Sequence, residues 1–466
     1  MLLSIEKLIY GGDGLARTPA GADGRSMAVF VPFVLPGERV EAGVLKEKSG
    51  FARGTVTKLI EASPDRIEAR CPYFRQCGGC HYQHIPYERQ LEFKVAILRE
   101  TLQRVGKIEL QSEVRVHASP LWNYRNRTRL QVQTAPAFAL GYFRFGSHEF
   151  LPVRECPISS PLINRVMARL LELGGLDCPP GVEEIELFAD AADERLLAWA
   201  WCESSVDRSA DRAGDRSADR KDLLRWAEAV EREVPQIGGL TFFAARRRAS
   251  SGQAKSGQAK PDGAFDQDAP FEQKPLAQSG AKSIRYATKD HTYQVSAGAF
   301  FQVNRHLIDE LDSVVAGDAR GEVALDLYAG VGLFSAVLAE NFHHILGVEA
   351  SQTAHDDFLH NVAGNVKAVA GRADDYLRSE SLRSRPVRKR PDLVVLDPPR
   401  AGVGKAGIRS LVALGAPRIR YVSCDPATLA RDIGPLLAAG YRIEEAHLFD
   451  LFPQTFHIES VMLLTR

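Results

Sequence analysis

Hydrophobic positions over residues 1–62 follow a short alternating pattern. Runs such as "MAVFVPFVL" and "ARGTVTKLIEAS" are separated by Gly, Pro and Asp turns at regular intervals. Short runs bounded by turn residues in this way are typical of strands in a small antiparallel sheet. We therefore predict a small antiparallel barrel over residues 1–62.

The middle of the chain mixes helical and strand patterns. Apolar residues recur at helical spacing over residues 87–105, "YERQLEFKVAILRETLQRV", and "LLRWAEAVEREVPQIGGLTFFAARRR" predicts a helix followed by a strand. Around the second segment, "DRSADRAGDRSADRK" and "SGQAKSGQAK" repeat short polar units and lack the apolar content to bury a core. We predict a central α+β domain over residues 63–295 with a low-complexity insertion near 204–282, disordered over 250–282.

From residue 296 strands alternate with helices. "EVALDLYAGVGLFSAVLAE" predicts a strand, a tight turn and a helix, and "HILGVEAS" predicts a second strand that ends in an acid. "PDLVVLDPPRAG", "RIRYVSCDPATLARD" and "HIESVMLLT" are further apolar runs, most with polar residues at the carboxyl end. The alternation predicts a doubly wound parallel sheet over residues 296–466, with a ligand crevice at the carboxyl ends of its strands.

Composition and charge narrow the class of protein. The chain has 466 residues, 45% apolar and 25% charged, which suits about three ordinary globular domains. No apolar run approaches the roughly 18 to 20 residues that span a bilayer, and "MLLSIEKLIYGGDG" is too acidic and too broken for a signal peptide, so we expect a cytoplasmic protein without a membrane partner. The formal net charge is zero. Any RNA-binding role must therefore depend on local patches.

One basic patch is visible in the sequence. Between residues 85 and 135 nine Lys or Arg stand against five Glu, and "NYRNRTRLQ" interleaves an aromatic residue with three of the arginines. This combination would suit a surface that faces phosphates. A solvated surface of mixed charge is an equal alternative.

Seven cysteines are spread unevenly over the chain. An odd number in such a long sequence argues against a disulfide framework and favours reduced thiols. "CPYFRQCGGCHYQ" contains a C-x5-C-x2-C pattern, and a fourth thiol lies in "RECPI". Four thiolates can hold a four-iron four-sulfur cluster or a tetrahedral zinc, and the asymmetric spacing favours iron and sulfur over a zinc ribbon. Cys178 and Cys202 lack such neighbours and are predicted to be core or surface thiols. The four candidate ligands are Cys71, Cys77, Cys80 and Cys156.

The glycine turn in "DLYAGVG" predicts a nucleotide-type ligand. Gly330 and Gly332 lie in a strand-to-helix turn, where the absence of side chains lets the backbone approach a ligand. A dinucleotide fingerprint would require Gly or Ala at the position of Ser335, so a nicotinamide cofactor is disfavoured. Glu349 ends the next strand, 23 residues after Asp326, where it can accept hydrogen bonds from ribose hydroxyls. We predict an adenosine ligand without a pyrophosphate, such as S-adenosylmethionine; the alternative is a surface acid beside a simple turn.

Polar residues of other kinds follow the later strands. In "LDPPRAG", Asp397 ends a buried strand and is followed by two prolines and Arg400, a rigid placement that a group-transfer site needs. Cys424 emerges at the same edge, beside a helix predicted to start near Ala427 whose dipole favours a thiolate, and is predicted to be a nucleophile. Glu459 lies in the closing strand, where burial predicts a raised pKa suited to a general base. A structural salt bridge is the alternative for Glu459.

With these motifs the chain resembles the bacterial RNA uracil-5 methyltransferases, in particular the iron-sulfur branch that acts on 23S ribosomal RNA. The resemblance covers nearly the whole chain; "SCDPATLARD" and "HIES" are specific, whereas the glycine turn is not. It implies a Rossmann-like class I methyltransferase domain, an amino-terminal TRAM barrel of the OB type, and methylation of carbon 5 of a uridine through a covalent bond between cysteine and carbon 6. Through these motifs and "FFQVN" it also implies a nucleophile at Cys424, a base at Glu459, cofactor-binding residues at Gln302, Tyr328, Glu349 and Asp397, and cluster ligands at Cys71, Cys77, Cys80 and Cys156.

Two positions depart from the family pattern, Ala329 where many members carry Cys and Leu333 where many carry Asn, so that one polar cofactor contact is missing. The expected cofactors are S-adenosylmethionine and a 4Fe-4S cluster. The expected partner is RNA, by resemblance 23S ribosomal RNA, without an obligate protein partner. Three alternatives stay open: a transfer RNA uridine-5 methyltransferase, an amino-group methyltransferase that would need no cysteine, and a non-catalytic iron-sulfur protein that binds RNA or senses redox state.

Overall fold

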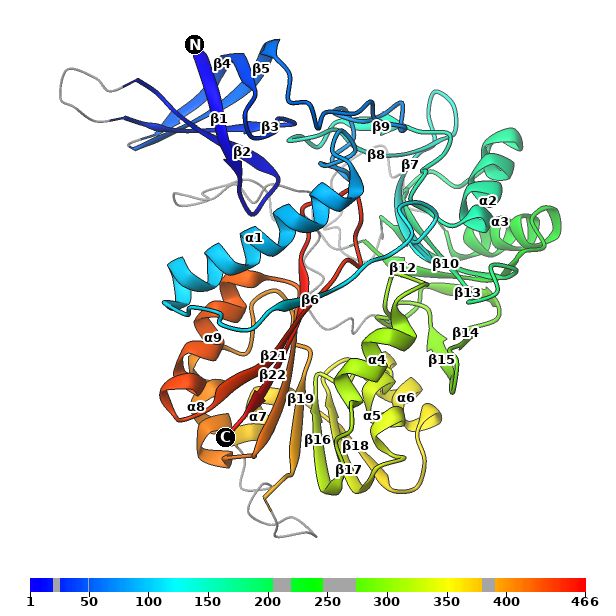
Figure 1. Ribbon diagram of the computed structural model, residues 1–466. Coiled ribbons are helices and arrows are strands. Elements are labelled where there is room, and N and C mark those ends of the chain that lie inside the picture. The colour runs from blue at the N-terminus through cyan, green and yellow to red at the C-terminus, as the bar shows by residue number, and fades with distance from the viewer. Residues whose placement is uncertain (20–25, 49, 204–218, 246–273, 379–389) are drawn as a thin grey trace, which may run out of the picture.

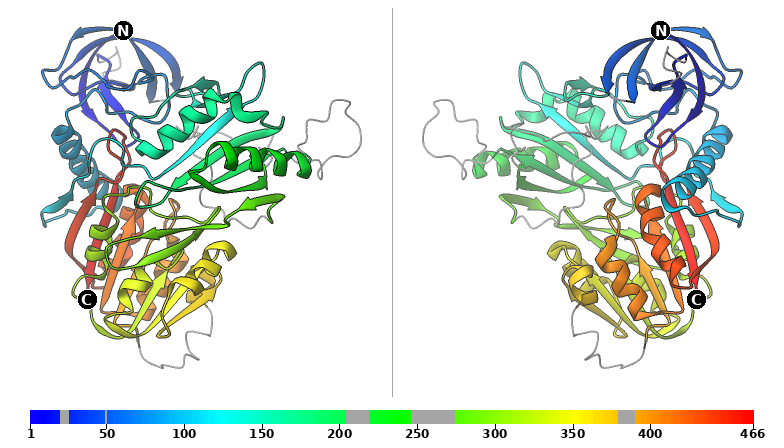
Figure 2. Two further views of the ribbon diagram at one scale, coloured as in Figure 1. Left: turned by 90° about the vertical axis from the view of Figure 1, so that its right-hand side faces the viewer. Right: turned by 90° about the vertical axis from the view of Figure 1, so that its left-hand side faces the viewer.

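The computed structural model describes residues 1–19, 26–48, 50–203, 219–245, 274–378 and 390–466. Its strands form a closed barrel, a 7-stranded sheet, a 2-stranded hairpin and an 8-stranded sheet (Figure 1). We call the three larger units the amino-terminal barrel, the central sheet and the carboxyl-terminal sheet. The barrel and the central sheet lie side by side above the carboxyl-terminal sheet (Figure 2).

The amino-terminal barrel closes in the strand order β1-β2-β3-β5-β4. Alternate residues of its strands, such as Val29 and Val31, point into a small apolar core, as the period of two requires. The predicted barrel is confirmed, but the prediction that it is wholly antiparallel is wrong, because β3 and β5 pair in parallel. The reason is that β4 pairs with β1 and not with β3, so that its hairpin partner β5 returns in the direction of β3. The strands are β1 (Leu2–Leu8), β2 (Asp13–Arg17), β3 (Ala28–Pro32), β4 (Arg39–Lys48) and β5 (Phe51–Glu61).

The central sheet has the order β13-β12-β11-β10-β7-β8-β9. Two helices, α2 and α3, cover one of its faces with a shared apolar core, and the predicted helix and strand around residues 220–244 are confirmed as α3 and β12. The elements are β7 (Arg127–Gln133), β8 (Ala139–Phe143), β9 (Phe150–Pro152), α2 (Pro161–Glu172), the 3-10 turn Gly174–Leu176, β10 (Val182–Ala189), β11 (Leu196–Cys202), α3 (Arg220–Glu233), β12 (Ile237–Ala244) and β13 (Ala277–Gly280).

The predicted insertion extends less far than its composition indicated. Residues 277–280 form an edge strand of the central sheet, in which Ala277 is buried and pairs with Phe242. The prediction of disorder up to residue 282 is therefore wrong at this end, because a single apolar position is enough to dock a short edge strand. Most of the repeated polar units lie in 204–218 and 246–273, outside the described residues.

The carboxyl-terminal sheet has the order β18-β17-β16-β19-β20-β22-β21-β6. Its first five strands are parallel, which confirms the predicted doubly wound sheet. The last three differ: β22 is antiparallel to β20 and to β21, and β6 comes from a distant part of the chain. The strands of this sheet are β6 (Val114–His117), β16 (Gly321–Leu327), β17 (Phe342–Glu349), β18 (Val366–Ala370), β19 (Leu393–Leu396), β20 (Arg418–Ser423), β21 (Arg442–Phe449) and β22 (Glu459–Thr465). The separate hairpin consists of β14 (Ser283–Ala287) and β15 (Thr292–Ser296).

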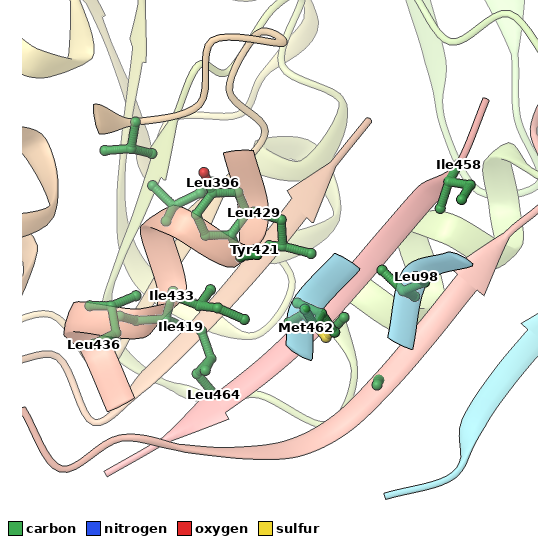
Figure 3. Close-up of a cluster of buried hydrophobic side chains, with 14 of the residues drawn as sticks. Leu98, Leu396, Ile419, Tyr421, Leu429, Ile433, Leu436, Ile458, Met462 and Leu464 are labelled. Carbon is green, nitrogen blue, oxygen red and sulfur yellow. The ribbon is translucent and has the colours of Figure 1, made fainter. Parts of the chain in front are cut away.

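Helices cover both faces of this sheet. Alternate residues of β19 divide between two cores: Leu393 and Val395 pack with α4, α5 and α6, whereas Val394 and Leu396 pack with α7, α8, α9 and the long helix α1. Figure 3 shows the second core, to which Leu98 of α1 belongs. The amphipathic helix predicted at 87–105 is thus confirmed, and it docks the chain that follows the barrel onto the carboxyl-terminal sheet. The helices are α1 (Tyr87–Gly106), α4 (Ile308–Ala316), α5 (Leu333–Leu338), α6 (Gln352–Asn361), α7 (Ala373–Arg378), α8 (Gly404–Leu414) and α9 (Pro426–Ala438).

The basic stretch between residues 85 and 135 does not act as one phosphate-facing surface. Lys94 is fully buried, and Arg127 lies 3.3 Å from the carboxylate of Glu186. Arg99 donates to two backbone carbonyls. These cations neutralise internal carboxylates or cap backbone groups, so neither of the two alternatives, a phosphate-facing or a solvated surface, describes them. Along the described ranges, no helix is both long enough and apolar enough to cross a membrane.

Candidate active site

One cavity of about 1260 Å³ lies where the barrel, the central sheet and the carboxyl-terminal sheet meet. Its wall includes every residue that the sequence predicts for the site, namely the catalytic residues, the cofactor-binding residues and the metal ligands. Cys178 and Cys202, predicted to be core or surface thiols, are not in the cavity wall. They pack with the core of the central sheet, as that prediction allowed. The predicted site residues in the cavity wall are Cys71, Cys77, Cys80, Cys156, Gln302, Tyr328, Glu349, Asp397, Cys424 and Glu459.

The order of the parallel strands brings several of these side chains together. Glu349 is the last residue of β17, Tyr328 directly follows β16, Asp397 directly follows β19 and Cys424 directly follows β20. These strands are neighbours and run in the same direction, so their carboxyl ends share one edge of the sheet. The backbone of Tyr328 has φ 66°, a left-handed conformation that is rare for a residue with a side chain and is often found at functional sites.

Glu459 reaches the same edge from the opposite direction. It is the first residue of β22, which is antiparallel to β20, and the neighbouring Ser460 pairs with Ser423. The amino end of β22 therefore lies beside the carboxyl end of β20, where Cys424 follows. The residues between Cys424 and Glu459 in the chain form α9, β21 and the connecting loops.

The glycine turn holds Glu349 in a fixed position at the cavity. Its two carboxylate oxygens accept hydrogen bonds from the backbone nitrogens of Gly330, at 2.8 Å, and Ser351, at 2.6 Å. Gly332 has φ 92°, and a Cβ at that position would come within 2.5 Å of the Phe358 ring, so only glycine fits there. Each carboxylate oxygen has a further lone pair to offer, and this arrangement fits the ribose hydroxyls of an adenosine ligand.

A second carboxyl group, that of Asp326, interacts electrostatically with Asp397. Asp326 is fully buried and accepts a hydrogen bond of 2.6 Å from the Ser335 hydroxyl, which explains a serine where a dinucleotide site would have glycine. Burial raises the pKa of Asp326 to about 6. Burial and the charge of Asp326 raise the pKa of Asp397 to about 7. Asp397 can therefore exchange a proton near neutral pH.

The loop that carries Cys424 is fixed by the cap of α9. Asp425 accepts hydrogen bonds from the backbone nitrogens of Ala427, at 2.9 Å, and Thr428, at 2.8 Å. This is the arrangement of a helix N-cap, and it places a negative charge at the positive end of the helix dipole. The helix begins at Pro426, next to the predicted start.

The electrostatics at Cys424 differ from the sequence-based expectation. Burial, followed by the charges of Glu459 and Asp397, raises the pKa of the Cys424 thiol, while Arg400 opposes the effect. The expectation that the helix dipole makes this thiol acidic is therefore wrong, because buried carboxyl groups outweigh a helix end that Asp425 already caps. Burial and the charge of Asp397 also raise the pKa of Glu459 well above its usual range, as predicted. Glu459 forms no salt bridge with any described residue, which removes the structural alternative for it.

Helix α1 holds the loop 450–458 that leads to Glu459. Lys94 and Asp450 are both fully buried and form a salt bridge of 2.6 Å. Gln90 and Gln454 are joined by two hydrogen bonds, one from the Gln90 amide nitrogen to the Gln454 side-chain oxygen and one from the Gln454 backbone nitrogen to the Gln90 side-chain oxygen, at 3.1 and 3.0 Å. Buried polar pairs of this kind fix a single geometry, because breaking either one leaves an unpaired polar group.

The four predicted metal ligands also lie in the cavity wall. Cys80 and Cys156 belong to one small apolar cluster, and the charges of Cys156 and Cys77 contribute to the raised pKa of Cys80 after burial. Among the described residues, however, no group of three or more His, Cys, Asp or Glu side chains is arranged to hold a metal ion. The four thiols therefore face a common space without forming a closed cage for a single ion. Four thiols are a donor set that suits a 4Fe-4S cluster or a tetrahedral zinc.

Three further residues in the cavity wall were not singled out from the sequence. Arg125 forms no salt bridge within the described part of the chain, and its guanidinium lies 5.9 Å from the centre of the Phe452 ring. His457 has Nδ1 3.4 Å from the Arg400 guanidinium, and Phe300 is 53% exposed. All three lie within motifs already noted, "NYRNRTRLQ", "HIES" and "FFQVN", so the signal was present but gave no reason to choose these positions.

Comparison with known proteins gives matches over the whole chain. The tRNA (Uracil-5-)-methyltransferase family matches residues 277–466, and the TRAM domain matches residues 1–57. An "Uncharacterized RNA methyltransferase" of Aquifex aeolicus is 32% identical over 99% of this chain and 97% of its own. The 23S rRNA (uracil(1939)-C(5))-methyltransferase RlmD of Halomonas elongata is 31% identical over 99% of this chain and 89% of its own.

Among solved structures, the Pyrococcus abyssi tRNA (uracil-54, C5)-methyltransferase in complex with S-adenosyl-L-homocysteine is similar to this chain. Its TM-score is 0.68 at 24% identity, with 100% of both chains covered. At this identity the likeness concerns the fold alone, and it extends over the barrel, the central sheet and the carboxyl-terminal sheet together.

Proposed function

The chain belongs to the RNA (uracil-5-)-methyltransferase family, and from this premise we propose that it methylates carbon 5 of a uridine in 23S ribosomal RNA through a covalent bond to Cys424. One observation carries the proposal: the cysteine, its neighbouring glutamate and the ribose-type carboxylate face one cavity at one edge of a doubly wound sheet. A methyltransferase that acts on an amino group would have no use for the cysteine.

S-adenosylmethionine is the proposed methyl donor, and when bound it supplies the methyl group as part of a sulfonium cation. Glu349 would accept hydrogen bonds from the ribose, with Gln302, Tyr328 and Asp397 completing the pocket. The cavity suits a cation because buried carboxyl groups line it, and a positive charge beside them favours their ionised forms. The same charge would offset the raised pKa values of Asp397 and Glu459 described above.

The chemistry that we propose begins at Cys424. Carbon 5 of uracil is a poor nucleophile, so the Cys424 thiol first gives up its proton to solvent and its sulfur bonds to carbon 6, which makes carbon 5 enolate-like. Carbon 5 would then take the methyl group from the donor, which leaves as S-adenosylhomocysteine. Glu459 removes the proton from carbon 5, the double bond between carbons 5 and 6 forms again, and the bond between sulfur and carbon 6 breaks to release the product.

The position of the reactive groups also limits the form of the substrate. Cys424, Asp397 and Glu459 lie in a cavity and not on an exposed surface, so the target nucleotide must leave any base stack to reach them. Arg125 and the exposed Phe300 are in the same wall, where a guanidinium can bind a phosphate and an aromatic ring can stack on a base. The TRAM match over residues 1–57 supports an RNA substrate.

The choice of 23S ribosomal RNA is supported by the name of the Halomonas elongata relative, over nearly the whole chain. The family description and the Pyrococcus abyssi neighbour name transfer RNA, which keeps that substrate as the second candidate. An amino-group methyltransferase remains a weaker candidate, since the Asp-Pro-Pro motif at Asp397 is shared with nitrogen methylation.

Deleting the gene should remove 5-methyluridine from one class of RNA. We expect nucleoside mass spectrometry on separately purified ribosomal and transfer RNA to show the loss in the ribosomal fraction only, relative to the parent strain. Loss from transfer RNA alone would overturn the substrate but not the reaction. Unchanged 5-methyluridine in both fractions would contradict the proposed function, and restoration by the cloned gene is the control.

We also propose that Cys71, Cys77, Cys80 and Cys156 hold a 4Fe-4S cluster with a structural role. The all-thiol donor set and its separation in sequence from the cofactor motifs support this assignment. Such a cluster would tie the segment after the barrel to the chain before α2, in addition to the backbone hydrogen bonds from Gly78 to Phe143 and from Phe145 to Gln76 that already join them.

Removal of one ligand tests the cluster. Protein with Cys77→Ser is expected to lose bound iron and sulfide and the associated visible absorption, and to unfold at a lower temperature than the wild type. Cys178→Ser, outside the cavity, serves as the matched control and should retain both. Unchanged stability and RNA binding in iron-free Cys77→Ser would contradict a structural role, and bound zinc in place of iron would contradict the cluster.

A further inference from the structure

One side chain of the barrel, Tyr10, contacts the loop that carries Cys424. This residue lies in the turn between β1 and β2, a turn closed by a hydrogen bond of 2.9 Å from the Ile9 nitrogen to the Asp13 carbonyl. The ring of Tyr10 packs against the core that the carboxyl-terminal sheet shares with α1. A residue of the barrel is thus part of the packing of another unit, so its position is fixed from both sides.

Tyr10 touches the two loops that carry the proposed nucleophile and the proposed base. Its hydroxyl donates to the backbone carbonyl of Cys424 at 3.3 Å. Its ring stands edge-on to Phe456, with centroids 5.8 Å apart and an interplanar angle of 87°. Phe456 immediately precedes the segment His457–Glu459, and His81 packs on it as well, at 4.7 Å.

The hydroxyl of Tyr10 keeps its proton in this position and can donate it. Burial and the charge of Asp425 raise its pKa, so the phenol stays protonated. A donor at the Cys424 carbonyl restrains the orientation of the peptide plane between Cys424 and Asp425. The direction of the Cα–Cβ bond of Cys424, and therefore of its sulfur, depends on that peptide.

The other restraints on this loop come from inside the carboxyl-terminal sheet. The Ser423 hydroxyl donates to the Asp425 carbonyl at 3.0 Å, and the Ser460 hydroxyl donates to the Ser423 carbonyl at 3.4 Å. Neither of these bonds depends on the barrel. The contact with Tyr10 is therefore a route by which the position of the barrel affects the catalytic loop.

We propose that Tyr10 is a positioning residue for Cys424, so that the TRAM barrel completes the active site in addition to any contact it makes with RNA. This inference rests on the proposed function, because it assigns Tyr10 a role in the addition of Cys424 to uracil. A barrel that served only to bind RNA would need no side chain hydrogen-bonded to the backbone of the nucleophile.

The test compares two substitutions that remove the same atom. Tyr10→Phe removes the hydroxyl at the Cys424 carbonyl, and Tyr441→Phe removes a buried hydroxyl that donates to the Ala416 carbonyl at 2.6 Å, away from the cavity. The full-length enzyme is assayed for methyl transfer to total RNA from a strain lacking the gene. The rate of covalent adduct formation is measured with 5-fluorouridine transcripts of 23S ribosomal and transfer RNA.

We expect Tyr10→Phe to lower kcat and the rate of adduct formation by roughly 2- to 10-fold, the effect of one hydrogen bond, with KM for S-adenosylmethionine and for RNA unchanged. Tyr441→Phe should leave both rates unchanged even where it lowers the melting temperature. Tyr10→Leu, which also removes the ring, should cause a larger loss, and Tyr10→Phe keeps the test valid where that variant does not fold.

Three results would separate the possible failures. Wild-type rates in Tyr10→Phe, or equal losses in Tyr10→Phe and Tyr441→Phe, would overturn the positioning role alone. A rise in KM for RNA with unchanged kcat would also overturn it and would make Tyr10 an RNA contact. Absence of product and adduct in the wild type would overturn the proposed function, and this inference with it.

Discussion

Replacing Cys424 with Ala is expected to abolish methyl transfer while S-adenosylmethionine still binds. The thiol is the only group in the proposed mechanism that can activate carbon 5, so the loss should be on the order of 10⁴-fold or more in kcat, as for other removed nucleophiles. Glu349 and the glycine turn, the proposed binding site of the donor, are not changed. Transfer of a labelled methyl group to RNA and equilibrium binding of the donor are the two measurements.

The matched control is Cys178→Ala, a thiol outside the cavity, which should have wild-type kcat. In the wild type, the adduct with 5-fluorouridine RNA should form faster as the pH rises. Burial and the nearby carboxyl groups raise the pKa of Cys424, so the fraction of thiolate is small at neutral pH and increases with pH. Turnover near wild type in Cys424→Ala, or an adduct rate that falls as pH rises, would contradict the covalent route.

Local patterns in the sequence predicted most of the fold because the signals concerned are short in range. The amphipathic helix at 87–105 and the strand-turn-helix at the glycine pair each follow from a period or a turn within one segment. What the sequence could not predict depends on pairing between distant segments. Nothing in "VRVH" at 114–117 indicates that it adds to the edge of the carboxyl-terminal sheet, or that β3 and β5 run in parallel.

The candidate site divides in the same way. Cys424, Asp397 and Glu349 could be proposed because each follows an apolar strand, and carboxyl ends of parallel strands meet at one edge. Tyr10 could not, since its contact with Cys424 spans 414 positions and depends on how the barrel packs. The direction of the pKa shift at Cys424 also depended on distant groups, because Glu459 and Asp397 are far from it in sequence.

Lys94 shows why charge patterns alone misled the search for an RNA surface. In the sequence it is one of nine basic residues in a stretch that would suit phosphates, but in the structure it is fully buried against Asp450. Its partner lies 356 positions away, so the pairing has no local signal. The consequence for function is that Lys94 supports the loop leading to Glu459, and the RNA contacts that we propose involve residues in the cavity wall such as Arg125.

The proposed role of Glu459 differs from that of Cys424 because Glu459 would act after the methyl group has moved. Its carboxyl group is buried, without an ion-pair partner among the described residues, and its pKa is raised by burial and by Asp397. A raised pKa means a stronger base once the proton has been lost. Gln has nearly the same size and can still accept a hydrogen bond, but it cannot take a proton from carbon 5. The addition of Cys424 and the methyl transfer should therefore survive the change.

Replacing Glu459 with Gln is accordingly expected to lower kcat by roughly 10²- to 10⁴-fold and to trap a covalent, methylated complex on ordinary RNA. The complex should appear on denaturing gels with natural uridine, without the fluorinated substrate that the wild type needs for trapping. Cys424→Ala combined with Glu459→Gln is the control and should form no complex. If Glu459→Gln turned over at the wild-type rate, another group would be the base; if it were inactive and formed no complex, Glu459 would be needed before methyl transfer and not after it.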